Sequence, residues 1–254
     1  MATTTVAPAP DQQPAKIGTL GRIFGVFFSP GETFADVARK PSWIAPLLLI
    51  TLINLSLNIV LANRVDWISV TQKQIEKSKF AAARFDQLND QQKAAAYTQQ
   101  AAIAKITRYV AGVLAMPFLA LLGGLVYMGA FNVLGGASIK YSMAFTMAIF
   151  AHLPVALHDL LAIPIALMKD PAAINPQNVV ASNVGALLGP DAPLWQQALG
   201  QSIDIFGIWA MILVAIAFTA ANPRKLTFGK SIGIVLTVYA VFALIGVGIA
   251  SIFS

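Results

Sequence analysis

Five stretches of the chain are apolar over enough residues to cross a lipid bilayer. A spanning α-helix needs about 20 mostly apolar residues, and each stretch approaches or exceeds that length with few charges. Polar segments separate the stretches, so the pattern predicts an all-α integral membrane protein with five transmembrane helices. The predicted spans are residues 43–63, 109–134, 142–168, 203–221 and 231–253.

The third predicted span carries an unusual group of ionisable residues. Its segment 152–159 reads His-Leu-Pro-Val-Ala-Leu-His-Asp and holds both histidines of the chain. Ionisable side chains are costly inside a bilayer and usually face the interior of a helix bundle. Pro154 also lacks the N–H that would bond to the carbonyl of Phe150, so a neighbouring group is expected to satisfy that carbonyl.

Two short helices are predicted before the first span, within residues 17–41. Apolar side chains recur on one face of the first helix: Ile17, Leu20, Phe24 and Phe27. This spacing is typical of a helix that lies in the membrane interface. The second helix begins with a capping residue, a proline suited to the first turn and an acid that completes a capping box: Ser29, Pro30 and Glu32. We expect the second helix to bury Phe34, Val37 and Ala38. The pair either anchors the chain or forms a cytoplasmic surface for a partner, and anchoring is favoured.

Two further segments lie outside the predicted spans. Residues 1–16 are rich in Thr, Ala and Pro and predict a disordered tail. Residues 64–108 are rich in Ala, Gln and Lys, which are good helix formers. They predict a helical hairpin that turns near Asn89 and continues into the second span. Charge and glutamine without aromatic clusters favour a solvated cap over a docking surface.

Composition supports a membrane protein and excludes several kinds of site. Hydrophobic residues make up 57% of the chain and charged residues 11%, whereas soluble domains carry about 25% charged residues. The chain has no cysteine, so disulfides, thiolate metal sites and a cysteine nucleophile are excluded. The net charge of +6 indicates basic loops that face anionic lipid headgroups, with no nucleic-acid partner expected.

The distribution of Lys and Arg predicts the orientation of the chain. Basic residues concentrate before the first span and in the loops that follow the second and fourth spans: Lys16, Arg22, Arg39, Lys40, Lys140, Arg224, Lys225 and Lys230. By the positive-inside rule the N-terminus is then cytoplasmic and the C-terminus is outside. The segment 64–108 disagrees, because it carries eight basic residues on the predicted outer side. The rule weakens for longer translocated segments, so we give more weight to the other loops.

No catalytic signature is visible in the sequence. The stretch Gly229-Lys230-Ser231 resembles the end of a phosphate-binding loop, but Arg224 stands where that motif needs a glycine. Zinc-protease, nucleophile-elbow and dinucleotide-binding motifs are missing as well. The sequence therefore predicts a protein that is not an enzyme, with no catalytic residues, no cofactor and no metal site.

Four polar residues form a candidate intramembrane cluster: Asn54, Asn58, His152 and Asp159. His152 and Asp159 are seven residues apart and share a helix face, while His158 points about 120° away. The two asparagines of the first span lie at similar depths, so we expect His152 near Asn54 and Asp159 near Asn58. Such a cluster is either structural or part of a proton or solute path. The structural interpretation is favoured because no polar stripe continues toward the cytoplasm.

The chain resembles the Ypt-interacting-protein (Yip) family, in its bacterial branch. Three segments carry the resemblance: 27–49 (FFSPGETFADVARKPSWIAPLLL), 135–154, with its Gly-Gly start and Ala-His-Leu-Pro end, and 228–233 (FGKSIG). The resemblance implies a five-helix membrane domain over residues 42–254 and a location in a bacterial inner membrane. Eukaryotic members of the family bind prenylated Rab-type GTPases. They have a longer N-terminal region than this chain, so GTPase binding is not supported here.

These patterns together predict a non-enzymatic membrane scaffold or partner-binding protein. The alternative is a small transporter or channel that uses the intramembrane cluster. The expected partners are the lipid bilayer and either another membrane protein or a second copy of the chain. Small residues at four-residue spacing, such as Gly246 and Ala250, suit either internal packing or a homo-oligomer.

Overall fold

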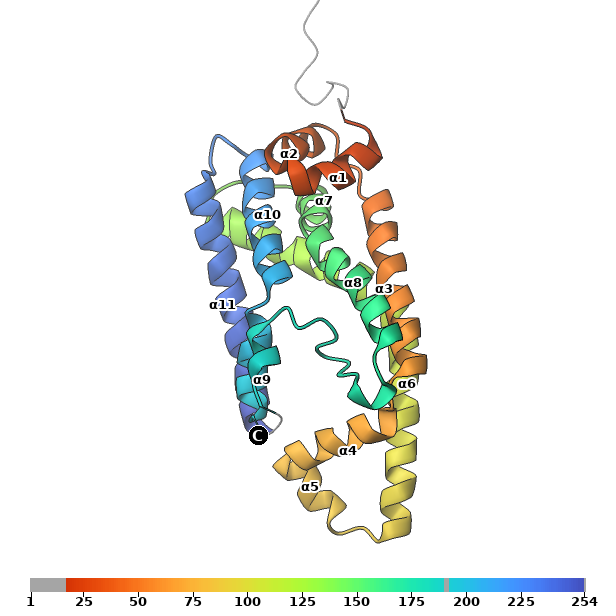
Figure 1. Ribbon diagram of the computed structural model, residues 1–254. Helices are drawn as coiled ribbons and strands as arrows, with labels where there is room; N and C mark the ends of the chain where they lie inside the picture. Colours follow the sequence, from red (N-terminus) through yellow and green to blue (C-terminus); the bar gives the residue numbers. More distant parts are fainter. Residues whose placement is uncertain (1–16, 190–191, 254) are drawn as a thin grey trace, which may run out of the picture. The chain divides into compact units, whose positions relative to one another are not determined.

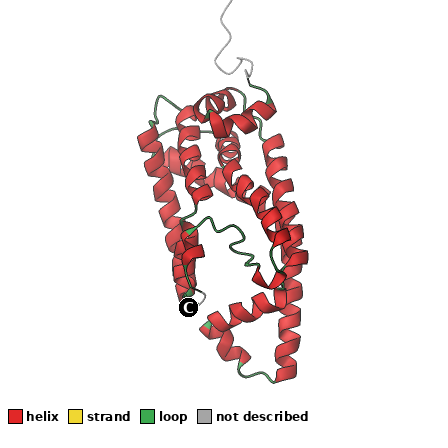
Figure 2. Cartoon of the chain, viewed as in Figure 1, coloured by secondary structure: helices red, strands yellow, loops and turns green. Residues whose placement is uncertain are grey.

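The computed structural model describes residues 17–189 and 192–253. Figure 2 shows helices with loops between them. The described residues also contain one isolated antiparallel bridge, between Asn183 and Asp204. The predicted all-α class is therefore confirmed. The predicted disordered tail, residues 1–16, lies outside the described residues.

Four helical segments of the described chain are long and apolar enough to cross a membrane. They are α3 (Ile44–Arg64), α6 (Asp90–Val133), α7 with α8 (Tyr141–Met168) and α11 (Phe228–Ile252). These segments coincide with four of the five predicted spans. The other predicted span corresponds to α10 (Ile205–Ala221), which has 17 residues. At 1.5 Å per residue α10 is about 26 Å long, slightly less than the ~30 Å of a hydrocarbon core.

The contacts of the chain divide it into two compact units. Unit 1 consists of Met1–Leu48, Leu119–Leu153 and Ala210–Val235. Unit 2 consists of Leu49–Phe118, Pro154–Trp209 and Leu236–Ser254. The long helices α3, α6 and α11 therefore each contribute one portion to each unit.

In unit 1, the two short helices that precede the first span pack against a third helix. They are α1 (Thr19–Phe28) and α2 (Pro30–Arg39), and Figure 1 shows both against the end of α7 (Tyr141–Ala151). Phe34 and Val37 of α2 are fully buried, as the sequence predicts, whereas Ala38 is only half-buried. The start of α3 joins the same packing, because Trp43 meets the ring of Phe145 edge-on at 5.3 Å.

The capping box predicted for α2 is wrong. Pro30 occupies the first turn, but the Ser29 side chain makes no capping hydrogen bond and Glu32 is exposed. The helix start is held instead through the Ser29 carbonyl, which accepts from the backbone N–H and the hydroxyl of Thr33. The helix pair was thus predicted correctly, although its capping chemistry was not.

The membrane-spanning part of unit 1 packs around aromatic rings and one close backbone contact. Phe131 of α6 and Phe218 of α10 stack with their ring centroids 4.1 Å apart. Gly124 of α6 lies so close to α7 that a Cβ atom built on it would be 2.9 Å from the Cα of Phe145. Only glycine fits between these two backbones without moving one of them.

Unit 2 contains the hairpin that the sequence predicts outside the membrane, and the helices that it meets. The hairpin comprises α4 (Trp67–Lys77), α5 (Lys79–Phe85) and the first part of α6. As predicted, α6 begins at Asp90 and continues without a break into its apolar part. The first arm has an additional break at Ser78, whose hydroxyl accepts from the N–H of Ala81 and caps α5.

One hydrophobic cluster joins the hairpin to the spans within unit 2. It draws on α3, α4, α6, α8 (Leu153–Met168) and the loop that follows α8. Its buried members are Leu57, Leu61, Val65, Trp67, Ala101, Ala162, Ala166, Ile174 and Val179. The loop after α8 is therefore packed against helices and is not a free connection. That loop includes η2 (Pro171–Ala173) and η3 (Val184–Leu187) and ends at α9 (Leu194–Ser202).

Three basic side chains of unit 2 bind backbone carbonyls of this loop or of the end of α8, and one of them, Arg108, donates to the Pro176 carbonyl at 3.5 Å. Arg64 donates to the carbonyls of Leu167 and Lys169 at 3.1 and 3.0 Å, and Lys169 donates to Val179 at 3.2 Å. The Arg108 guanidinium lies 5.4 Å from the Trp67 ring centroid, a cation–π contact. Arg64 and Arg108 belong to the basic residues of 64–108 that disagree with the positive-inside pattern, and both have local partners in the folded protein.

Candidate functional site

The third predicted span consists of two helices, because the helix is interrupted at His152. His152 has φ −90° and ψ 5° and ends α7, and α8 begins at Leu153. Pro154 is the physical cause, since it has no N–H to continue the helical ladder and its ring crowds the preceding turn. The His152 N–H bonds to the carbonyls of Ala148 and Ile149 at 3.1 and 3.3 Å. The predicted span 142–168 therefore corresponds to one apolar segment, Tyr141–Met168, with a helix break at His152.

Asp159 of α8 is the centre of a buried polar group in unit 2. Asn54 of α3 donates from Nδ2 to Asp159 Oδ2 at 3.0 Å, and His158 Nδ1 lies 3.1 Å from Asp159 Oδ1. Both carboxylate oxygens thus have a partner. Asp159 and Asn54 are 8% and 7% exposed, so their hydrogen bond is shielded from solvent. The predicted pairing of Asp159 with Asn58 is replaced by a pairing with Asn54.

Asn58 completes the group through its own helix. Its Nδ2 donates to the carbonyl oxygen of Asn54 at 2.9 Å and lies 3.2 Å from Asn54 Oδ1. Its Oδ1 is buried and has no hydrogen-bond partner among the described residues, and the same is true of Thr51 Oγ1 about two turns earlier. Buried oxygens of this kind are usually satisfied by ordered water. The α3 face that carries Thr51, Asn54 and Asn58 therefore has room for further hydrogen bonds.

Neither His152 nor His158 has the surroundings that the sequence predicts. His152, in unit 1, bonds through Nδ1 to the carbonyl of Ala148 at 2.7 Å, so that nitrogen must carry the hydrogen. Its ring lies 6.4 Å from that of Tyr127. His158 was expected to point away from the cluster, yet it contacts Asp159 and packs edge-on against Phe206 at 5.3 Å.

A second buried polar group joins α1 to α2 in unit 1, and we call it the Arg22–Asp36 clasp. Arg22 Nη2 lies 2.8 Å from Asp36 Oδ2, and the two residues are 3% and 0% exposed. Arg22 Nη1 donates to the Lys40 carbonyl and to the Ser42 hydroxyl, each at 2.8 Å. Arg39 bonds to the other carboxylate oxygen of Asp36 at 2.8 Å. One guanidinium therefore ties α1 to α2 and to the segment that leads into α3.

The clasp leaves one apolar face of α1 exposed. Ile23 and Val26 are buried beside Arg22, whereas Leu20, Phe24 and Phe28 are 70%, 62% and 84% exposed. Of the four residues predicted on the interfacial face, Leu20 and Phe24 are exposed, whereas Ile17 and Phe27 are half-buried. The clasp was not predicted. The available signal was a charged residue on the buried face of each short helix.

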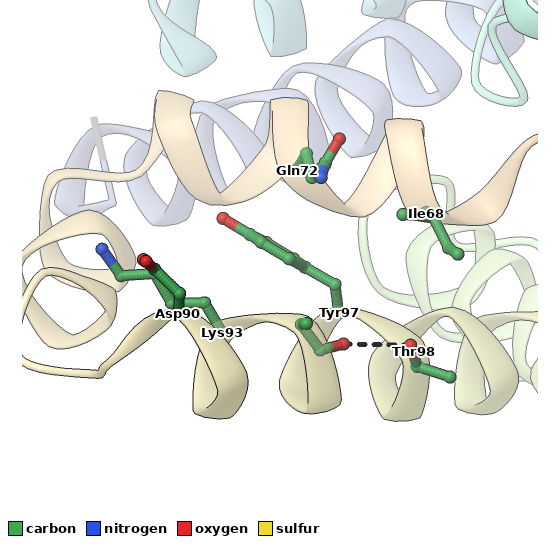
Figure 3. A pocket seen from close by; sticks show the side chains of 7 residues that line it. Ile68, Gln72, Asp90, Lys93, Tyr97 and Thr98 are labelled. Atoms are coloured by element: carbon green, nitrogen blue, oxygen red, sulfur yellow. Dashed lines mark hydrogen bonds between the residues drawn. The ribbon is translucent and has the colours of Figure 1, made fainter.

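A groove lies between α4 and the start of α6 in unit 2, with a volume of about 440 Å³. Figure 3 shows the Tyr97 ring lying across it toward α4, with Asp90 and Lys93 near one end. The carboxylate and the ammonium have opposite charges, so they offer no net charge that would select an ion. The groove is open to solvent along the hairpin, and it does not include any residue of the predicted cluster.

Comparison with known proteins gives one match. The sequence matches the Yip1 domain over residues 24–251, which includes Asn54, Asn58, His152 and Asp159 and begins two residues after Arg22 of the clasp. No curated protein and no solved structure matches the chain. The match confirms the resemblance found in the sequence and, with the long apolar helices, establishes a multi-pass membrane protein. The chain belongs to the Yip1 domain family.

Proposed function

We propose that this Yip1-family protein is a non-enzymatic scaffold that presents its N-terminal helix pair to a protein partner at the cytoplasmic face of a bacterial inner membrane. The Arg22–Asp36 clasp carries this proposal. A buried ion pair adds little net stability compared with apolar residues of the same size, and its best-attested use is to define one arrangement. The clasp thus gives α1 and α2 a fixed position on α7.

The exposed face of α1 supplies the contact with the membrane. Leu20, Phe24 and Phe28 suit the boundary between headgroups and acyl chains, where an amphipathic helix lies in the plane of the membrane. The exposed residues at the start of α2, including Glu32, then remain available to a partner. The proposal includes five spans, with α10 as the fourth in chain order. The N-terminus is cytoplasmic and the C-terminus is periplasmic.

Site-specific photocrosslinking in intact cells tests the scaffold role. A photoreactive phenylalanine analogue at Glu32 is expected to capture one reproducible protein partner. Adding Asp36→Ala should abolish that adduct, because the helix pair loses its fixed position. The same analogue at Gln91 of the outer hairpin is the matched control and should not capture that partner. A Glu32 adduct that persists unchanged with Asp36→Ala would contradict the proposal.

The proposed orientation predicts a labelling pattern with an impermeant thiol reagent. The chain has no cysteine, so single cysteines can be added without background. Cysteines at the exposed positions Gln91 and Gln177 are expected to react in intact cells, whereas one at Arg224 should react only after lysis. Reaction at Arg224 in intact cells, without reaction at Gln91, would reverse the orientation.

A transporter or channel is the second candidate function. The unpartnered oxygens of Thr51 and Asn58 favour it, because they lie on the α3 face that also meets Asp159 and suit bound water. A pathway needs such groups in a continuous series. The short local bonds of Asp159 to Asn54 and His158 support the structural interpretation instead.

Substitution of Asp159 separates these two candidates. If the cluster is structural, Asp159→Asn should preserve assembly and partner capture, because the amide still accepts a hydrogen bond from Asn54. Asp159→Leu should lower the free energy of unfolding by only about 0.6 kcal/mol, the average of measured membrane hydrogen bonds. Thermal unfolding in detergent and cellular function are the measurements. An Asp159→Asn protein that is fully stable but inactive would favour the transport pathway.

A further inference from the structure

Two loops at one end of unit 1 are joined by hydrogen bonds into a single surface, which we call the paired-loop surface. Residues 134–140 connect α6 to α7, and residues 222–227 connect α10 to α11. The Asn222 side chain donates to the Ala137 carbonyl, and Lys230 Nζ donates to the Gly135 carbonyl at 2.7 Å. Leu226 is 1% exposed and packs beneath the loops. The two loops are therefore held as one unit.

The first loop has an unusual backbone that its contacts hold in place. Gly136 has φ +64° and Ser138 has φ +55°, a left-handed conformation that a side chain disfavours. The Asn132 side chain closes this loop by donating to the Ile139 carbonyl at 3.0 Å and accepting from the Ile139 N–H at 2.6 Å. A strained serine persists only where its surroundings determine the conformation, and such residues concentrate at binding sites.

The paired-loop surface is strongly basic. Segments 119–153 and 210–235 contain four basic residues and no acidic residue. These four are Lys140, Arg224, Lys225 and Lys230, and all of them are exposed. Helices α7 and α11 begin at these loops and α6 and α10 end there, so the helix dipoles oppose one another and the positive field comes from the four side chains. An anion is the complementary ligand for this surface.

Exposed apolar side chains lie directly beside these charges along the chain. Val133 and Leu134 end α6 and are 80% and 54% exposed, and Phe228 at the start of α11 is 47% exposed. A soluble anion would gain nothing from these groups, whereas a lipid has both a charged headgroup and acyl chains. We propose that the paired-loop surface binds anionic lipid, with the phosphodiester between Lys140, Lys230 and Arg224 and the acyl chains against Val133, Leu134 and Phe228.

The site goes beyond the scaffold role and does not depend on a protein partner. Clusters of Lys and Arg next to a spanning helix attract anionic headgroups, by up to about fivefold in binding per residue, which corresponds to ~1 kcal/mol each. The Lys230 ammonium has three donors and uses one for Gly135, so it keeps donors for a phosphate oxygen. Its bond to the loop fixes the charge in position before lipid arrives.

Lipid quenching at one labelled position tests the proposal. The variant Leu134→Cys, with a bimane label, is reconstituted in phosphatidylcholine vesicles that contain brominated phosphatidylglycerol or brominated phosphatidylcholine. We expect brominated phosphatidylglycerol to associate several-fold more tightly at this position than brominated phosphatidylcholine. The quantity measured is the ratio of these two associations. Changing Lys140, Arg224, Lys225 and Lys230 together to Gln should reduce the ratio to about one. The double variant Arg224→Gln with Lys225→Gln, which leaves the Asn222 and Lys230 contacts intact, should lower it part of the way.

A matched set controls for total charge. Changing Lys73, Lys77, Lys79 and Arg84 to Gln removes the same number and type of charges from the outer hairpin and should leave the ratio unchanged. A ratio of one in the unsubstituted background would overturn the proposal, and so would an equal effect of both sets. Loss of the preference on adding inorganic phosphate at constant ionic strength would also overturn it, by assigning the surface to a soluble anion.

Discussion

Replacing Asp36 with alanine is expected to lower the free energy that protects α1 and α2 against opening by about 3–5 kcal/mol. The Arg22 guanidinium is 3% exposed, and without Asp36 it would be a buried charge with no counter-ion. Amide hydrogen exchange of residues 19–39 in detergent measures this directly. Exchange should accelerate more than a hundredfold in the helix pair, because each 1.4 kcal/mol corresponds to about a factor of ten.

Two further variants test whether the effect comes from the buried Arg22–Asp36 pair or from the loss of any charge in the helix pair. Arg39 also bonds to Asp36 but is 31% exposed, so Arg39→Ala should cost no more than about 1 kcal/mol. The double variant Arg22→Met with Asp36→Leu removes both buried charges together and should recover most of the protection. Equal acceleration by Asp36→Ala and Arg39→Ala would show that the buried pair has no special role.

Replacing Gly124 with leucine is expected to have the second largest effect. A Cβ atom there would lie 2.9 Å from the Cα of Phe145, and the added side chain has no room between α6 and α7. Overpacking of this kind costs typically about 1–3 kcal/mol, and the larger value is expected because a backbone must move. The melting temperature in detergent should fall clearly.

The adjacent glycine provides a matched control for this substitution. Nothing lies within 4 Å of a Cβ atom built on Gly123, so Gly123→Leu adds the same side chain to an open position. Its melting temperature should stay close to that of the unsubstituted protein. If Gly124→Leu and Gly123→Leu have the same melting temperature, the close approach of α6 and α7 does not contribute to stability.

Hydropathy predicted the helical class and the position of the spans well, because a helix that crosses lipid must be mostly apolar along its whole length. The start of α6 was also predictable, since Asn89 and Asp90 interrupt a run of helix-forming residues. The sequence predicted the helix break at His152 only in part. Pro154 predicted a missing hydrogen bond, but whether a helix bends or ends there depends on the groups that surround it.

The partners of the buried polar groups could not be predicted from the sequence. Depth along an ideal helix placed Asp159 near Asn58, but the carboxylate meets Asn54, one helical turn away. Helix rise alone does not determine how far one helix slides along another. The Arg22–Asp36 clasp joins residues 14 positions apart on two helices, and helical periodicity within either helix does not contain that information.

The outer hairpin has a consequence for the biosynthesis of the protein. In the proposed orientation, residues 64–108 cross the membrane with eight basic and four acidic residues, a net charge of +4. A membrane potential that is negative inside opposes this movement by about 2.3 kcal/mol per charge for each 100 mV, or roughly 9 kcal/mol in total. Arg64 and Arg108 find their carbonyl and aromatic partners only after translocation. In the proposed orientation, insertion of the first two helices works against the potential, and we expect it to proceed faster in cells whose membrane is depolarised.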